Sequence, residues 1–249
     1  MEVRNHISVS QIKMFLRCPL QYKFRYIDGL KISPTSSLTL GKSIHSALES
    51  NYSQKITSKQ DLPGEKILDL FSDRWEKEAV ETLFSEDEKA GMVKDDGVKM
   101  VRAYHDQISP TIQPRLVEHE FNLSFENVDY TLKGIIDLVD VEGRIIDHKT
   151  AKRSMAPDDV AADIQLTCYA LAYRSLFGAP EKELRFDVMV RTKVPKLQQI
   201  PTTRTQEDIQ RFLKIVGFVS KAIQSGIFYP CGNRQVCSWC GYYGLCEKW

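Results

Sequence analysis

The sequence lacks several features that mark particular protein classes. No apolar run approaches the ~20 residues needed to cross a bilayer, and the N-terminus lacks the charged-then-apolar pattern of a secretion signal. There is no internal repeat and no low-complexity linker. The formal net charge is only +1, so the overall charge does not indicate a nucleic-acid partner. We therefore expect a cytoplasmic globular protein whose six cysteines stay reduced.

Charge is distributed unevenly along the chain. Residues 1–33 and 182–204 each carry six Lys/Arg against two acids, whereas residues 61–96 carry five against twelve. The two basic segments could together form a phosphate-binding surface. On charge alone, ordinary solvated surface residues are the simpler interpretation.

Apolar periodicity predicts helices first, then strands, then an alternation of both. Ser10 is expected to cap the first helix, and 31–39 is expected to be a loop. This order predicts a single α/β (α+β) domain over 1–249, with a mixed sheet, flanking helices and a helical insertion at 61–109. The expected helices are 10–17, 20–26, 40–52, 64–82, 88–108, 158–177 and 206–225, and the first expected strands are 115–125 and 130–138, followed by 184–191 and 197–203.

The first two strands alternate polar and apolar residues and are expected to pair about a turn at Asn127-Val128. A shift of one residue would set apolar residues opposite polar ones, so the pattern specifies the register. The pairs in this register include Leu123 with Leu132, Phe125 with Tyr130, and Glu118 with Asp137.

A second turn beside Gly143 would set Asp137 directly opposite Asp147 on the next strand. Opposed residues have Cβ atoms only ~5 Å apart, and like charges there destabilise a sheet. Glu118, Asp137 and Asp147 would then form a row, with Lys149 on the same face as Asp147. Such a row suits a bound Mg²⁺ or Mn²⁺ that activates water beside a phosphate. An exposed polar face with unrelated acids is the minor alternative.

These residues resemble the core motifs of the PD-(D/E)xK nuclease superfamily, and in particular its RecB-like branch with an iron–sulfur cluster. The proline of the motif is absent, because Ile136 precedes Asp137. Each motif alone is weak, but their order and spacing together are specific. The matching segments are Gly41–His45, Val117–Phe121, Gly134–Asp137, Ile146–Thr150 and Gln165–Tyr169.

The resemblance implies a restriction-endonuclease-like core and assigns metal ligands within it. The ligands would be His45, Asp137, Asp147 and the backbone carbonyl of His148. The ring of His148 should point to the opposite face, where we interpret it as packing. Lys149 would orient the attacking water or stabilise developing negative charge.

Three further residues receive catalytic roles from the same resemblance. Glu118 is the expected upstream acid, with Glu120 as a reserve that points the same way. Gln165 and Tyr169 lie four apart and share one helix face, from which they could position DNA or the lysine. Taken alone, that pair is more typical of ordinary helix packing.

The cysteines form a second pattern. Cys237, Cys240 and Cys246 follow the spacing C-x2-C-x5-C, and Cys18 stands far upstream before a proline. This arrangement resembles the iron–sulfur staple of AddB-type nucleases and of CRISPR-associated spacer-acquisition exonucleases. The resemblance implies a [4Fe-4S] cluster held by residue 18 and the segment 231–249, with zinc as the alternative. Cys168 is interpreted as packing, and Cys231 is not needed by the pattern.

The function implied is a metal-dependent deoxyribonuclease, most simply an exonuclease on single-stranded or unwound DNA. It would serve DNA repair or recombination, or the processing of phage or mobile-element DNA. Gly41-Lys42-Ser43 lacks the earlier glycine of a phosphate-binding P-loop, so no motor is expected. The chain would act alone or with a separate helicase or integrase.

DNA is the expected partner, contacted by basic residues in two segments beyond the acid row. Two other interpretations stay open: a CRISPR adaptation nuclease that trims prespacers, and a non-catalytic DNA-binding scaffold subunit. The intact acids and lysine argue against the scaffold. The basic residues concerned are Lys152, Arg153, Arg191, Lys193 and Lys196.

Overall fold

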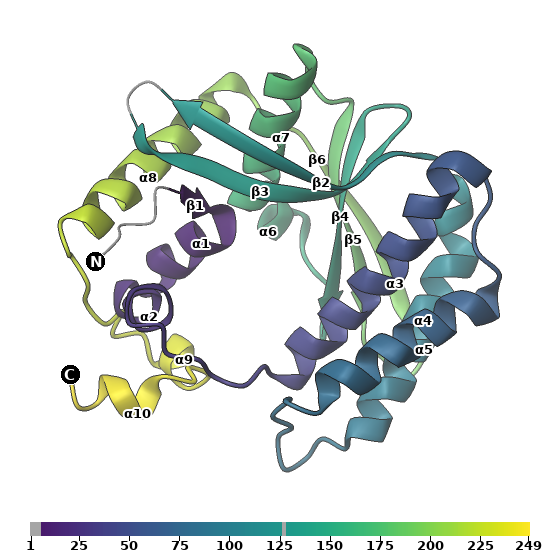
Figure 1. Ribbon diagram of the computed structural model, residues 1–249, viewed down its shortest axis with the longest axis horizontal. Helices are drawn as coiled ribbons and strands as arrows, with labels where there is room; N and C mark the ends of the chain where they lie inside the picture. The colour runs from purple at the N-terminus through teal and green to yellow at the C-terminus, as the bar shows by residue number, and fades with distance from the viewer. Residues whose placement is uncertain (1–5, 126–127) are drawn as a thin grey trace.

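The computed structural model describes residues 6–125 and 128–249, in which one six-stranded mixed sheet lies between two layers of helices (Figure 1). The mixed α/β class expected from the sequence is confirmed. The strand order is β1-β3-β4-β5-β6, and β2 pairs with the other edge of β3. The strands are β1 (His6–Ser8), β2 (Pro114–Phe125), β3 (Val128–Asp140), β4 (Arg144–Ala151), β5 (Glu183–Val190) and β6 (Lys196–Thr202).

The register between β2 and β3 is the predicted one over most of the ladder, with Leu123 opposite Leu132. The predicted pairing of Phe125 with Tyr130 is wrong. An irregularity after Leu123 shifts the ladder, so that Phe125 pairs with Val128. The predicted turn at Asn127-Val128 lies partly outside the described residues.

The central strand β3 has an edge that two other strands share. β1 pairs in parallel with residues 131–133, and β4 pairs antiparallel with Leu138 and Val139 only. β2 occupies the opposite edge of β3. On the edge that β1 and β4 share, residues 134–137 therefore have no strand partner among the described residues. The β3–β4 pairs follow the predicted register. Continued by one residue, this register sets Asp137 opposite Asp147, at the point where β4 separates from β3, which we call the fork.

Two hydrophobic layers cover the sheet. Helices α1, α7 and α8 pack on one face, and α3, α4 and α5 pack on the other (Figure 1). No described helix is both long and apolar enough to span a membrane. The helices are α1 (Val9–Arg17), α2 (Pro19–Tyr22), the π-helix η1 (Lys23–Ile27), α3 (Ser36–Ser58), α4 (Gly64–Ala79), α5 (Ala90–Gln107), the 3₁₀ helix η2 (Ser109–Thr111), α6 (Pro157–Ala161), α7 (Ile164–Phe177), α8 (Gln206–Gln224), α9 (Arg234–Cys237) and α10 (Tyr243–Cys246).

Three of the differences from the predicted helix boundaries have a capping residue as their cause. Ser8 rather than Ser10 caps α1, in a capping box with Gln11. The predicted loop at 31–39 ends early, because the Thr35 side chain caps α3 and starts it at Ser36. The predicted helix 158–177 is two helices, since Asp163 caps a new one, α7.

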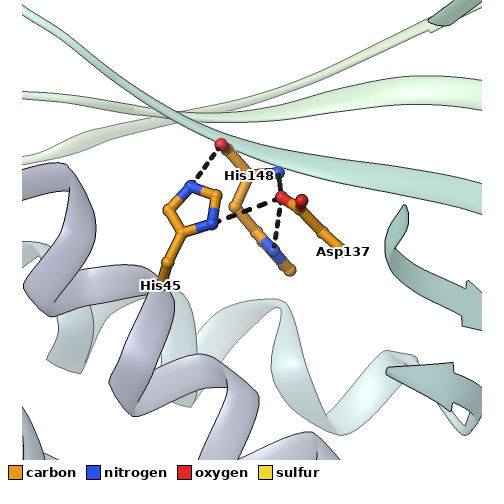
Figure 2. A group of neighbouring side chains, drawn as sticks. All are labelled: His45, Asp137 and His148. Carbon is orange, nitrogen blue, oxygen red and sulfur yellow. Dashed lines mark hydrogen bonds and ion pairs between the residues drawn. The ribbon is translucent and has the colours of Figure 1, made fainter. Parts of the chain in front are cut away.

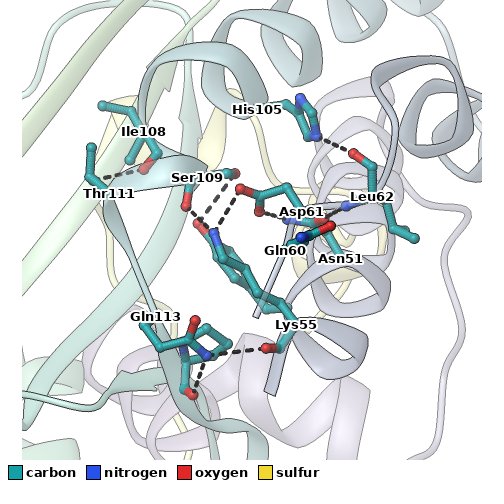
Figure 3. A network of polar contacts seen from close by, with 12 residues as sticks. Asn51, Lys55, Gln60, Asp61, Leu62, His105, Ile108, Ser109, Thr111 and Gln113 are labelled. Carbon is teal, nitrogen blue, oxygen red and sulfur yellow. Dashed lines mark hydrogen bonds and ion pairs between the residues drawn. The ribbon is translucent and has the colours of Figure 1, made fainter. Parts of the chain in front are cut away.

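A buried polar network joins the three helices of the second layer (Figure 3). The Lys55 side chain is only 5% exposed, and its Nζ donates to Asp61 Oδ2 and to the Ser109 carbonyl, each at 2.7 Å. Asn51 donates to the other oxygen of Asp61 at 2.8 Å. These bonds join α3 to the start of α4 and the end of α5, and so fix α3 against the sheet.

Candidate active site

The glycines of two motifs allow close approach between elements around the fork. A Cβ at Gly41 of α3 would lie 3.4 Å from the Thr150 side chain, so the helix runs close against β4. A Cβ at Gly134 of β3 would lie 2.4 Å from the Phe121 ring, which fills that space. These contacts place His45 over β4 and set the path of β3 toward Asp137.

His45, Asp137 and His148 meet at the fork (Figure 2). Each offers one ligand atom, and these atoms lie within 4.8 Å of one another. Asp137 Oδ2 lies 3.3 Å from His45 Nδ1 and 3.8 Å from His148 Nδ1, and it accepts a hydrogen bond from the His148 backbone N–H at 3.1 Å. His45 Nε2 lies 2.8 Å from the His148 carbonyl oxygen, so that carbonyl also faces the site.

Asp147 and Lys149 lie on the side of β4 that faces α7. Lys149 Nζ pairs with Asp147 Oδ2 at 2.6 Å and donates to Gln165 Oε1 at 3.0 Å. The Gln165 amide donates in turn to Asp147 Oδ1 and to the Tyr169 oxygen, both at 2.8 Å. Gln165 therefore contacts both the acid and the lysine of the motif, and Tyr169 contacts Gln165.

Two acids in this cluster, Glu118 and Asp137, have raised pKa values. Burial, followed by the charges of Asp137, Glu49 and Asp147, raises the pKa of Glu118 to about 7. Burial and the neighbouring Asp147 also raise the pKa of Asp137, against the lowering influence of His45. Burial contributes most to both shifts, and repulsion between neighbouring acids adds to it.

Lys149 remains a cation in this setting. Burial is the largest single influence and lowers the pKa of its ammonium group, but Asp147, Asp137 and Asp163 together raise it, and the net pKa lies above its usual value. The ammonium group also lies 4.9 Å from the centre of the Phe186 ring. The site thus contains one fixed positive charge beside its acids.

Glu118 has an unusual backbone for a strand residue. Its φ is 45°, in the left-handed region that residues other than glycine rarely adopt. Strain of this kind costs ~1–3 kcal/mol and is commonly found at functional sites. Glu118 lines the same groove as His45, whereas Glu120 lines the groove on the other side of Asp137. The two acids therefore do not share one position.

The ring of His148 has polar partners that sequence reasoning missed. It lies on the opposite face from Lys149, as expected, and is 3% exposed. Its Nε2 lies 3.1 Å from the hydroxyl of Tyr104 on α5, and that hydroxyl lies 2.7 Å from Asp187 on β5. Burial and the nearby His45 lower the pKa of His148. No sequence signal marks Tyr104 or Asp187, because only the tertiary fold brings them together.

Two grooves open on either side of Asp137 and share Ile135 and Asp137 in their walls. The groove toward α3 has a volume of about 760 Å³ and includes Lys42 and Arg74. The groove toward α1 has a volume of about 640 Å³ and includes Tyr26. Asp137 is thus accessible from two directions, whereas Asp147 is fully buried.

The predicted DNA-contacting residues are partly neutralised in this structure. Glu88 lies 3.3 Å from Lys152 Nζ and 3.1 Å from Arg191, and accepts a hydrogen bond from Ser36 at 2.5 Å. The Ser36 hydrogen bond, against burial, lowers the pKa of Glu88 to about 2, with Arg191 and Lys152 assisting. Lys196 instead donates to Ser154 at 3.0 Å.

The cysteines of the second motif line one small apolar pocket between α2 and the C-terminal segment. Cys231, which the motif does not need, lies in the same pocket and contacts the thiols of Cys237 and Cys18. Cys168 is buried in the main core, away from this group. The pocket cysteines are Cys18, Cys231, Cys237, Cys240 and Cys246.

Comparison with known proteins places the chain among nucleases. The model of the PD-(D/E)XK nuclease superfamily matches residues 6–247. The "Gene 69 protein" of Mycobacterium phage D29 is 25% identical over 268 residues, which is 94% of this chain and 93% of that protein. The crystal structure of a presumed exonuclease from Eubacterium rectale superposes with a TM-score of 0.64 at 14% identity, covering 98% of this chain and 88% of the other.

Proposed function

The chain belongs to the PD-(D/E)XK nuclease superfamily, and on that premise we propose that it is a metal-dependent exonuclease that hydrolyses single-stranded or unwound DNA. One observation carries the proposal. Ligand atoms of His45, Asp137 and His148 converge at the fork of the sheet, and the Asp147–Lys149 pair lies next to them. This is the set of groups that metal-assisted phosphodiester hydrolysis needs.

The residues present fit a divalent cation. Burial, with added repulsion from neighbouring acids, raises the pKa values of Glu118 and Asp137, and a bound cation would offset both effects. We assign the ligands as His45, Asp137, Asp147 and the His148 carbonyl, with Glu118 as the nearby acid. Mg²⁺ or Mn²⁺ bound there would lower the pKa of a coordinated water and neutralise charge on a phosphate oxygen.

The proposed role of Lys149 differs from that of the acids. Its ammonium group stays charged and is held in one place by Asp147 and Gln165. A fixed positive charge beside the scissile phosphate stabilises the negative charge that develops as the bond breaks. Gln165 acts through these two neighbours, and Tyr169 accepts from the same amide. Both are therefore positioning residues.

The groove on each side of Asp137 supports a substrate that runs past the acids rather than ending at them. Lys42 and Arg74 line one side, and Lys133 and Tyr26 line the other. Basic side chains contact the phosphates of a single strand, and an aromatic ring provides a stacking surface for a base. Release of Lys152 and Arg191 from Glu88 would add two further cations.

We also propose that the cysteine pocket holds a [4Fe-4S] cluster through Cys18, Cys237, Cys240 and Cys246. Three clustered cysteines with one distant partner do not follow the paired C-x2-C spacing usual for structural zinc, which supports the larger cluster. Its role would be structural, because it joins residue 18 to the end of the chain.

The curated relative comes from a phage, which favours processing of phage or mobile-element DNA over the other pathways. A CRISPR adaptation nuclease is the alternative within the same chemistry. A non-catalytic DNA-binding scaffold is the alternative outside it. A separate helicase or integrase is a possible partner in either pathway.

The test is digestion of DNA by protein purified without oxygen. End-labelled linear single-stranded and double-stranded DNA and closed single-stranded circles are each incubated with Mg²⁺ or Mn²⁺. We expect loss of the linear single strand from an end, while the circle survives. Rapid cleavage of the circle would make the protein an endonuclease. Binding without any cleavage would make it a scaffold.

A further inference from the structure

The hydrogen bonds around His148 fix which of its ring nitrogens carries the proton. Both oxygens of Asp187 accept from N–H groups of Arg185 and Gln199, at distances from 2.8 to 3.5 Å. Asp187 is therefore an acceptor for Tyr104, and the single hydroxyl proton of Tyr104 points to Asp187 at 2.7 Å. The Tyr104 oxygen can then only accept from His148, so Nε2 of the ring is the donor and carries a proton.

This assignment leaves Nδ1 of His148 with a bare lone pair inside the acidic cluster. Nδ1 lies 3.8 Å from Asp137 Oδ2, the same oxygen that lies 3.3 Å from His45 Nδ1 (Figure 2). A lone pair that faces a carboxylate oxygen is repelled by it unless positive charge lies between them. The ring is buried and held at its other nitrogen, so it cannot turn away without losing the Tyr104 bond.

We propose that the ring Nδ1 of His148, and not only its backbone carbonyl, is a ligand of the catalytic cation. Tyr104 and Asp187 are the positioning residues that hold the ring in its ligating form. Histidine ligands in proteins usually donate their other N–H to such a partner, which fixes the tautomer and ring orientation. The inference rests on the proposed metal-dependent function and extends it to a residue whose ring the motif leaves unassigned.

The proposal has a consequence for the choice of metal. Mg²⁺ binds oxygen ligands and keeps much of its water, whereas imidazole nitrogen suits later divalent metals. Two imidazole rings among the ligands therefore favour Mn²⁺ over Mg²⁺. His45 alone would give a weaker preference.

The experiment measures the ligands directly, without reference to cleavage. Full-length protein is loaded with Mn²⁺, and pulsed electron paramagnetic resonance counts the directly coupled ¹⁴N nuclei. We expect two coupled nitrogens in the wild type and one in His148→Gln, whose amide can still bond Tyr104 but has no group at the Nδ1 position. Calorimetry should give Mn²⁺ affinity ~10-fold or more weaker in His148→Gln and in Tyr104→Phe.

The matched control is His105→Gln, which alters a histidine of α5 whose ring bonds the Leu62 carbonyl instead. It should bind Mn²⁺ as the wild type does. A single coupled nitrogen in the wild type, or unchanged Mn²⁺ affinity in His148→Gln, overturns the inference and leaves the proposed function intact. Failure of the wild type to bind Mn²⁺ at all would overturn both. The wild-type nitrogen count decides the matter even if a variant does not fold.

Discussion

The carboxylate of Asp137 accepts a hydrogen bond from the backbone N–H of His148 at 3.1 Å, just beyond the point where the β3–β4 ladder ends. A side chain thus takes over the bond that the sheet would otherwise have made. The contact holds Asp137 at the mouth of the fork, next to His45 and across from Asp147. The position of Asp137 is therefore set by where two strands separate.

The raised pKa of Glu118 predicts an inverted pH dependence of stability. Its carboxyl has a pKa of about 7 in the folded protein against an ordinary 4.5. Between these values the folded state holds a proton that the unfolded state has lost, so the free energy of unfolding falls as pH rises through this window. Urea unfolding of metal-free protein at pH 5 and pH 7.5 measures the effect.

In that experiment Glu118→Gln should show a smaller decline between the two pH values, because it removes one of the titrating groups. Glu120→Gln is the matched control on the same strand and should decline as the wild type does. An identical decline in Glu118→Gln would show that this carboxyl is not the source.

Lys55 should matter for stability far more than an exposed lysine with an equally short ion pair. Lys55→Ala leaves Asp61 and the Ser109 carbonyl without their buried partner, which should lower the free energy of unfolding by ~3–5 kcal/mol. Lys23 pairs with Asp28 at the same 2.7 Å, but both side chains are about one third exposed. Lys23→Ala should cost less than ~1 kcal/mol. Comparable losses in the two variants would contradict a structural role for the network of Figure 3.

The cysteine pocket yields a prediction about metal content and folding. Cys240→Ala should lose most of its iron and inorganic sulfide and fold poorly, because one ligand of four is missing. Cys231→Ser should keep about four iron atoms per chain, as the motif does not need this residue. Absorption spectra and iron, sulfide and zinc analysis after anaerobic purification provide the measurement. Stoichiometric zinc with little iron would refute the cluster, and iron loss in Cys231→Ser would make Cys231 a ligand.

Prediction from the sequence was most accurate where many residues of a pattern specified the same strand register. Alternating residues on two long strands fixed the pairing of Leu123 with Leu132, and the same register brought the acids together. The three-residue strand β1 was missed, since so short a segment has no detectable period. The start of α3 was misplaced because Thr35, an ordinary loop residue by composition, caps it.

Contacts made only in three dimensions could not be predicted. His148 was interpreted as packing, yet Tyr104 and Asp187 reach its ring from two elements distant in sequence. Cys231 is close enough in sequence to compete as a ligand but is not needed by the pattern, and the fold brings it into the pocket with the other four. In both cases the local pattern was correct, and the missing information was which surfaces the tertiary fold brings together.

The most direct test of the central claim is the rate of cleavage of end-labelled single-stranded DNA by the wild type, Asp147→Ala and Lys149→Ala, with Mg²⁺ and with Mn²⁺. Asp158→Ala, at an exposed acid of α6, is the matched control and should cleave normally. The account predicts a loss of at least ~10²-fold for both site variants with either metal, while circular dichroism stays unchanged. Cleavage at the wild-type rate by folded Asp147→Ala would contradict it.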